Sequence, residues 1–168
     1  MPNTFTLIAS STVGAGGAAS IDFTSIPSSY TDLVIKLSGR TTYASTVEAT
    51  SLALNGSNTY ATKYLQGDGG SAASGSQTIL NLGLMTGANA TGNTFGNSEF
   101  YIPNYTSSSA KAFSGEGVSE NNATQAFAGL FAGSASLTAA ITSITITPNA
   151  GGSFVQHSTA YLYGVRSS

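Results

Sequence analysis

The segment 12–23, TVGAGGAASIDF, contains the pattern G-x-G-x-x-A, which in dinucleotide-binding folds cradles a pyrophosphate. That chemistry needs a helix directly after the glycines, because the amino end of the helix binds the phosphate. Here Ile21 and Phe23 alternate with polar residues, which is typical of a strand, and Pro27 ends the run. We therefore predict a glycine-rich hairpin turn at 14–19 that joins the first two strands and is exposed, tight and free of phosphate.

Residues suited to acid–base or nucleophilic catalysis are few. His157 is the single histidine, and no G-x-S-x-G motif sits between a strand and a helix, so a Ser-His-Asp hydrolase is not indicated. Paired carboxylates can hydrolyse glycosides, but the acidic residues are spread out and no pair has a distinctive context. We expect a protein that is not an enzyme and holds no cofactor. The acidic residues are Asp22, Asp32, Glu48, Asp68, Glu99, Glu116 and Glu120.

Metal-ligating residues are equally sparse. The chain has no cysteine and one histidine, which excludes the usual zinc ligand sets. Calcium sites need clustered carboxylates, whereas Asp68 stands alone in its glycine-rich segment. No metal site is predicted.

Charge is low throughout the chain. Only 7% of the 168 residues are charged and the net charge is −2, with five scattered basic residues. Nucleic acids and anionic lipids both need clustered Lys and Arg, so we expect neither partner. Weak electrostatic repulsion between copies favours self-association. The first residues, MPNTFTLIAS, lack the basic region of a signal peptide, so we expect synthesis in the cytoplasm.

Period-two alternation of apolar residues is the main structural signal. Leu33, Ile35 and Leu37 lie on one face of a predicted strand, and an Asn55-Gly56 pair marks a hairpin. Segments 67–75 and 87–96 are typical of surface loops. We predict a single antiparallel all-β domain over residues 1–168, a jelly-roll-like β-sandwich of about ten strands. The strands are predicted at residues 4–9, 18–23, 31–39, 49–54, 59–66, 77–85, 98–104, 110–118, 124–132, 141–147 and 158–166, with one or two of these ranges doubtful.

Four stretches of the chain resemble one known group of proteins. They are YTDLVIKLSGRT from Tyr30, LALNGSNTYATKYL around Asn55, FYIPNYTSSSAKAF around Asn104, and the closing STAYLYGVRSS. In sequence and order they are similar to small β-rich structural proteins of tailed bacteriophages, especially phages of marine bacteria and cyanobacteria. The resemblance extends from about residue 4 to residue 166, and its motifs mark a scaffold and not an active site.

The resemblance implies a virion component, assembled in the cytoplasm of the host bacterium. The leading interpretation is a capsid decoration protein, commonly a homotrimer, that packs on the major capsid protein. The alternative is a tail-fibre or receptor-binding module that recognises a host-surface glycan, through loops 67–75, 87–97 or 105–109. We expect Tyr163 and Gly164 to fix the packing between the sheets. The scaffold or interface candidates are Asp32, Arg40, Asn55, Gly56, Tyr60, Tyr64, Asn104, Tyr105, Lys111, Tyr163 and Gly164.

The tyrosines next to Asn and Thr are compatible with two structural roles. Tyr60, Tyr64, Tyr101 and Tyr105 could form a platform on which sugars stack. They could equally pack in the core or at a subunit interface, where both the ring and the hydroxyl find partners. The core or interface reading is favoured.

Overall fold

The computed structural model describes residues 4–57, 59–79, 81–120 and 126–166, which form twelve β-strands and contain no helix. The all-β prediction is confirmed, with twelve strands in place of about ten. In chain order they are β1 (Phe5–Thr12), β2 (Ile21–Phe23), β3 (Asp32–Gly39), β4 (Val47–Leu54), β5 (Thr59–Gly67), β6 (Ala72–Ile79), β7 (Asn81–Thr86), β8 (Gly96–Ile102), β9 (Lys111–Glu120), β10 (Ala126–Ala135), β11 (Ile144–Pro148) and β12 (Thr159–Val165).

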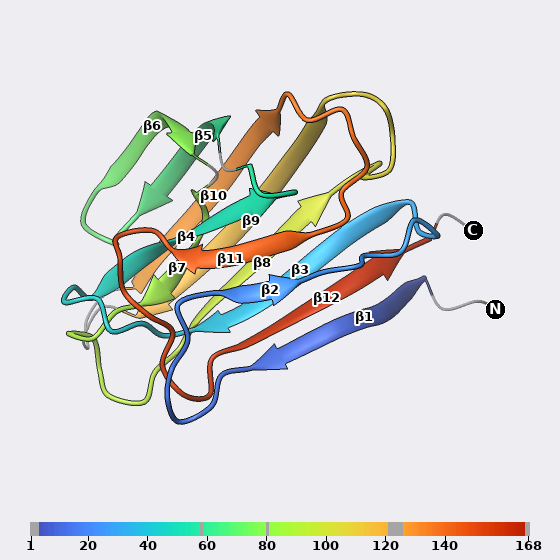
Figure 1. The fold of residues 1–168 in the computed structure, drawn as a ribbon. Helices are drawn as coiled ribbons and strands as arrows, with labels where there is room; N and C mark the ends of the chain where they lie inside the picture. The colour runs from blue at the N-terminus through green and yellow to red at the C-terminus, as the bar shows by residue number, and fades with distance from the viewer. Residues whose placement is uncertain (1–3, 58, 80, 121–125, 167–168) are drawn as a thin grey trace.

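The strands form two antiparallel sheets. The larger has eight strands in the order β1-β12-β3-β8-β9-β10-β5-β6, and the smaller has four in the order β2-β11-β4-β7. In Figure 1 the four-stranded sheet lies in front of the eight-stranded sheet. The predicted antiparallel β-sandwich is thereby confirmed, while the jelly-roll connectivity stays a prediction.

Apolar side chains from both sheets form the core. Leu33, Ile35 and Leu37 of β3 are at most 1% exposed, and Ile144 and Ile146 of β11 are fully buried. Successive side chains of a strand point to opposite faces, so this alternation assigns one face of β3 to the core. The other face of the eight-stranded sheet is turned away from the core.

Strand β7 lies very close to the inner face of the eight-stranded sheet. A Cβ added to Gly117 of β9 would lie 2.6 Å from the amide nitrogen of Leu84, and one added to Gly83 would lie 2.5 Å from Ser98 Oγ. Glycine is therefore required where the two sheets approach here.

The predicted hairpin between the first two strands is wrong. β1 pairs with β12, whereas β2 pairs with β11 in the other sheet. Segment 14–19 instead carries the chain from one sheet to the other. It is exposed over residues 14–17 and tight, as expected, since the Gly17 amide donates to the Gly14 carbonyl at 3.0 Å. Glycines permit a bend but do not determine which strand the chain then pairs with.

The loop predicted at 67–75 is shorter in the structure, because β6 begins at Ala72 and pairs with β5. Its sequence, AASGSQTI, has no alternating large apolar residues, which is why a strand was not expected there. The predicted strand at 77–85 divides between the end of β6 and β7. Leu80, which belonged to that pattern, lies outside the described residues.

Candidate functional site: the outer face of the eight-stranded sheet

The face of the eight-stranded sheet turned away from the core, here called the outer face, is the main exposed apolar surface of the described chain. Residues paired across antiparallel strands share a face, so the registers define its members. Among the residues whose side chains the structure describes, eight large hydrophobic ones are exposed, and seven of these lie on it, with Tyr43 the exception. The seven are Phe5, Leu7, Leu65, Tyr101, Val118, Leu130 and Tyr161.

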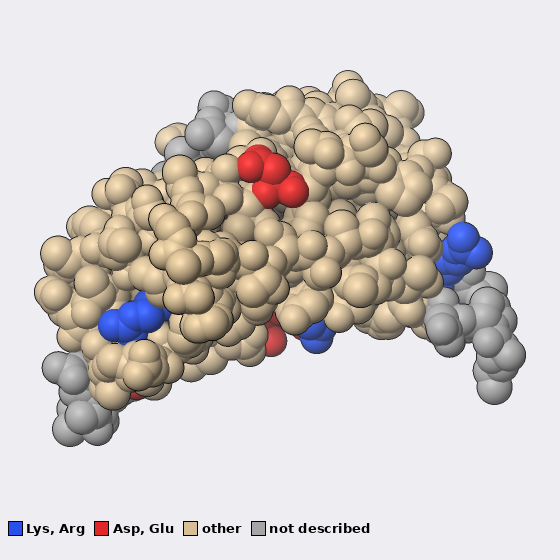
Figure 2. Space-filling view, turned by 60° about the horizontal axis from the view of Figure 1, so that its bottom comes forward, with Lys and Arg blue, Asp and Glu red and all other residues tan. Residues whose placement is uncertain are grey.

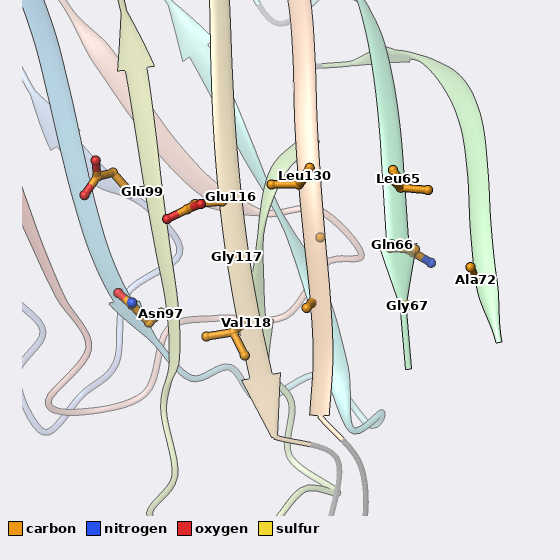
Figure 3. Close-up of a pocket in the computed structure, with 12 residues that line it drawn as sticks. Leu65, Gln66, Gly67, Ala72, Asn97, Glu99, Glu116, Gly117, Val118 and Leu130 are labelled. Atoms are coloured by element: carbon orange, nitrogen blue, oxygen red, sulfur yellow. The ribbon is translucent and has the colours of Figure 1, made fainter. Parts of the chain in front are cut away.

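A hollow of about 520 Å³ lies on this face over β5, β6, β8, β9 and β10. Figure 3 shows Glu99, Glu116, Leu130 and Leu65 in one row across it. The registers agree, since Glu116 pairs with Glu99 on one side and Leu130 on the other, and Leu130 pairs with Leu65. Leu65 and Leu130 are 54% and 58% exposed, so the hollow presents apolar surface that the described chain does not cover.

Glu99 and Glu116, which are far apart in the sequence, are cross-strand neighbours on the outer face. Like charges directly opposite one another destabilise a sheet. Lys36 Nζ lies 2.7 Å from Glu99 Oε2 and compensates one of them. The hydrogen bond to Glu99 and its charge raise the pKa of Lys36. Both Glu99 and Glu116 are accessible to solvent.

Tyrosines occupy the other half of the outer face. Tyr161 and Tyr163 of β12 stack with ring centroids 6.5 Å apart, and the Phe5 ring lies 6.4 Å from that of Tyr163. The Tyr101 hydroxyl donates to Asp32 Oδ2 at 2.8 Å, and this hydrogen bond raises the pKa of Tyr101.

Charged side chains are scarce on the surface shown in Figure 2, where most atoms belong to uncharged residues. Among the described residues no group of three or more His, Cys, Asp or Glu side chains is placed to hold a metal ion. Within the same residues no helix is long and apolar enough to cross a membrane. His157 stands just before β12 with a φ of 74°.

Arg40, a predicted scaffold residue, ties down the loop between β7 and β8. Its guanidinium donates to the carbonyls of Thr91 at 2.7 Å and Thr94 at 3.1 Å, and to those of Ala88 and Ala90 at 3.2 Å. One side chain thus satisfies four backbone acceptors, which the planar fork of an arginine suits and the ammonium of a lysine does not.

The predicted turn at Asn55-Gly56 is present, with φ values of 50° and 78° and reciprocal backbone hydrogen bonds between Leu54 and Ser57. However, it joins β4 to β5, which belong to different sheets, so it is not the hairpin that was expected. The Asn55 side chain also binds the segment before β11. It donates to the Ala140 carbonyl at 2.8 Å and accepts from the amides of residues 142 and 143.

Lys111 is 1% exposed, and its ammonium group donates hydrogen bonds to backbone carbonyls of two loops. It donates to the carbonyls of Ser107 at 2.6 Å and Ser109 at 2.7 Å, and more weakly to that of Leu137 at 3.4 Å. Burial lowers the pKa of Lys111. Nearby, the Asn104 amide donates to Asp32 Oδ1 at 2.8 Å, which fixes the loop after β8.

Tyr60 and Tyr105 belong to the core, so they cannot form a sugar platform. Tyr60 is 5% exposed and packs edge-on against Phe113 at 5.7 Å, and its hydroxyl donates to the Ser57 carbonyl. Tyr105 is fully buried and its hydroxyl donates to the Pro27 carbonyl. Tyr64 is half-buried against the core.

The expectation that both Tyr163 and Gly164 pack between the sheets is wrong for Tyr163. Leu162 of β12 is fully buried in the core, so its neighbour Tyr163 points to the outer face. Gly164 does face inward, where a Cβ would lie 2.3 Å from the Tyr30 ring. A one-residue change of register exchanges the faces of a whole strand, and the alternation alone does not say which face is buried.

Sequence reasoning missed the apolar row of Leu65 and Leu130 and the Glu99–Glu116 pair, because each depends on which strands are neighbours. A partial signal is present in β10, where Phe127 and Phe131 share one face of the strand and Leu130 therefore lies on the opposite face.

Compared with known protein families, with curated proteins and with solved structures, the chain matches none of them.

Proposed function

We propose that this protein is a non-enzymatic structural component of a bacteriophage virion, a capsid decoration protein that stabilises the shell by self-association and by packing on the major capsid protein. The observation that carries the proposal is the collection of exposed apolar side chains on one face, three of which, Leu65, Val118 and Leu130, line the hollow. Large apolar patches on soluble proteins mark surfaces that a partner covers.

Burial of this surface supplies the binding free energy without chemistry. Apolar surface removed from water contributes about 25 cal/mol per Å². The five strands that line the hollow, β5, β6, β8, β9 and β10, are seven to ten residues long. At a spacing of about 4.8 Å and a rise of about 3.3 Å per residue they span roughly 700 Å². A standard protein–protein interface buries about 800 Å² per partner, so this half of the outer face is close to the size of one interface.

Charge in this region also suits assembly. Lys36 and Glu99 compensate each other, so Glu116 is the carboxylate of the hollow whose charge a partner would have to neutralise. The low net charge of −2 adds only weak repulsion between neighbouring copies. The hydrogen bonds of Arg40, Asn55 and Lys111 hold the loops that surround the sheets, which favours a rigid building block.

The proposal is tested on purified virions. Imaging is expected to show copies distributed over the capsid shell, and copies confined to the tail would contradict the decoration role. The predicted homotrimer is checked separately, by the mass of the isolated protein in solution.

A variant locates the attachment surface. Leu130→Glu places a charge in the hollow. Leu130 is 58% exposed, and the new carboxylate opposite Glu116 is expected to lower the free energy of unfolding by no more than about 1 kcal/mol, so the variant should still fold. We expect this variant to be absent from particles. The matched control, Thr138→Glu, changes an exposed residue outside the outer face and is expected to be incorporated normally. Normal incorporation of Leu130→Glu would exclude the hollow as the attachment site.

A further inference from the structure

The tyrosine half of the outer face has the geometry of a ligand site. Tyr101 of β8 and Tyr163 of β12 each pair with Val34 of the strand between them, so the three side chains form one row. Tyr161 lies in the next row, beside Lys36 and Glu99. Two strand spacings separate Tyr101 from Tyr163, about 10 Å.

Val34, between the two tyrosines, is almost completely covered. Its side chain points to the outer face, because Leu33 and Ile35 on either side of it are buried in the core. Val34 is nevertheless only 3% exposed. Its cross-strand neighbours on this face are Tyr101, which is 39% exposed, and Tyr163, which is half-buried, so an aromatic side chain stands on each side of Val34.

Fixed polar groups stand next to the rings. The bond from the Tyr101 hydroxyl to Asp32 holds that ring in place, and Asp32 is itself held by the Asn104 amide at 2.8 Å. The Lys36–Glu99 pair, 2.7 Å between its charged atoms, supplies one cationic donor and one anionic acceptor in the row of Tyr161. Donors, acceptors and aromatic surface are therefore presented together on rigid strands.

We propose that this tyrosine platform, formed by Tyr101, Tyr161 and Tyr163 with Lys36 and Glu99, binds a neutral oligosaccharide. A pyranose ring has an apolar C–H face that packs on an aromatic ring, and hydroxyls that bond to carboxylate and ammonium groups. A row of about 10 Å suits two or more linked sugars better than a single one.

Charge selects among saccharides. Lys36 is the only cation on the platform, and Glu99 compensates it, while Asp32 and Glu116 add negative charge nearby. Sialylated, uronic or phosphorylated glycans would meet uncompensated carboxylates. The ligand is therefore a chain of neutral hexoses or N-acetylhexosamines. Of the platform residues only Glu99 also lines the hollow over β5, β6, β8, β9 and β10, through which shell attachment is proposed.

The test probes the isolated protein with an array of bacterial-surface oligosaccharides that includes neutral and acidic members. Wild-type protein is expected to bind neutral chains, and Tyr161→Leu to weaken binding by about tenfold, because an aliphatic side chain fills the space without an aromatic face. Tyr161→Phe keeps the ring and is expected to retain most of the binding.

Tyr43→Leu is the matched control, because Tyr43 and Tyr161 are both 38% exposed and Tyr43 lies off the outer face. It is expected to bind as wild type does. The proposal is overturned if no neutral glycan binds, if only acidic glycans bind, or if Tyr161→Leu binds as well as wild type. Each of these outcomes leaves the decoration role intact, because particle imaging tests that role independently.

Discussion

Ser98 of β8 bonds to both backbone groups of Leu84 in β7 and so joins the two sheets. Its hydroxyl donates to the Leu84 carbonyl at 2.9 Å and accepts from the Leu84 amide at 3.0 Å. β7 is an edge strand of the four-stranded sheet, and an edge leaves backbone groups without a ladder partner. Ser98, which is 1% exposed, supplies that partner inside the molecule.

Replacement of this hydroxyl is expected to destabilise the fold. Ser98→Ala leaves a buried donor and a buried acceptor unpaired, at a cost of about 2 kcal/mol in the free energy of unfolding. Urea denaturation should show a lower midpoint with an unchanged slope. Ser114→Ala, on the exposed face of neighbouring β9, is expected to stay within about 0.5 kcal/mol of wild type. Equal stability of Ser98→Ala and wild type would show that the bridge contributes nothing.

The glycines of segment 14–19 are not equivalent. Gly17 has a φ of 71°, and a Cβ there would lie 2.9 Å from the Phe154 carbonyl oxygen. Gly16 has nothing within 4 Å of its Cβ position. We expect Gly17→Ala to lower the free energy of unfolding by about 2 kcal/mol and Gly16→Ala to be neutral. Thermal denaturation of the two variants checks this, and similar losses in both would refute the assignment of the turn to Gly17.

The sequence predicts individual strands of this protein well but not their partners. The spacing of Leu33, Ile35 and Leu37 at every second position predicts β3, because one face of this strand is buried in the core. The edge strand β6, eight residues long, carries no such pattern, because it consists mainly of small residues. That β1 pairs with β12 depends on contacts between the two ends of the chain, and no local feature near Phe5 encodes such a contact.

The candidate site was less predictable than the fold, because it is a property of neighbouring strands. The i, i+2 spacing of Tyr161 and Tyr163 places them on one face, but nothing in β12 alone says that Ala160 and Leu162 take the core side. Several of the scaffold candidates, Asn55 and Arg40 among them, make their bonds to segments remote in sequence. Whether any of them reaches a partner stays a prediction.

Asn55 is expected to hold the segment before β11 through its side-chain amide. Asn55→Gly keeps a residue that tolerates the φ of 50° but removes the bonds to residues 140, 142 and 143. The expected loss is about 2 kcal/mol, with faster hydrogen exchange at the amides of Thr142 and Ser143. Unchanged exchange at those two amides would show that Asn55 matters only for the turn.

Alkaline pH is expected to destabilise the fold through its buried tyrosines. Burial raises the pKa of Tyr105 and of Tyr60 above the ordinary value of 10.0. Their contribution to stability is complete below pH 10.0. It declines as the pH rises through the folded-state pKa, because above 10.0 the unfolded chain releases these protons more readily than the folded chain.

Urea unfolding at a series of pH values from about 8 to about 11.5 measures this decline. Tyr105→Phe removes one of the groups, so its stability should fall less steeply above pH 10 than that of wild type. At neutral pH the same variant should be less stable by about 1 kcal/mol, because the bond to the Pro27 carbonyl is lost. Tyr43→Phe, at an exposed position, should follow the wild-type curve. Parallel curves for Tyr105→Phe and wild type would mean that the Tyr105 phenol ionises as readily in the folded chain as in the unfolded one.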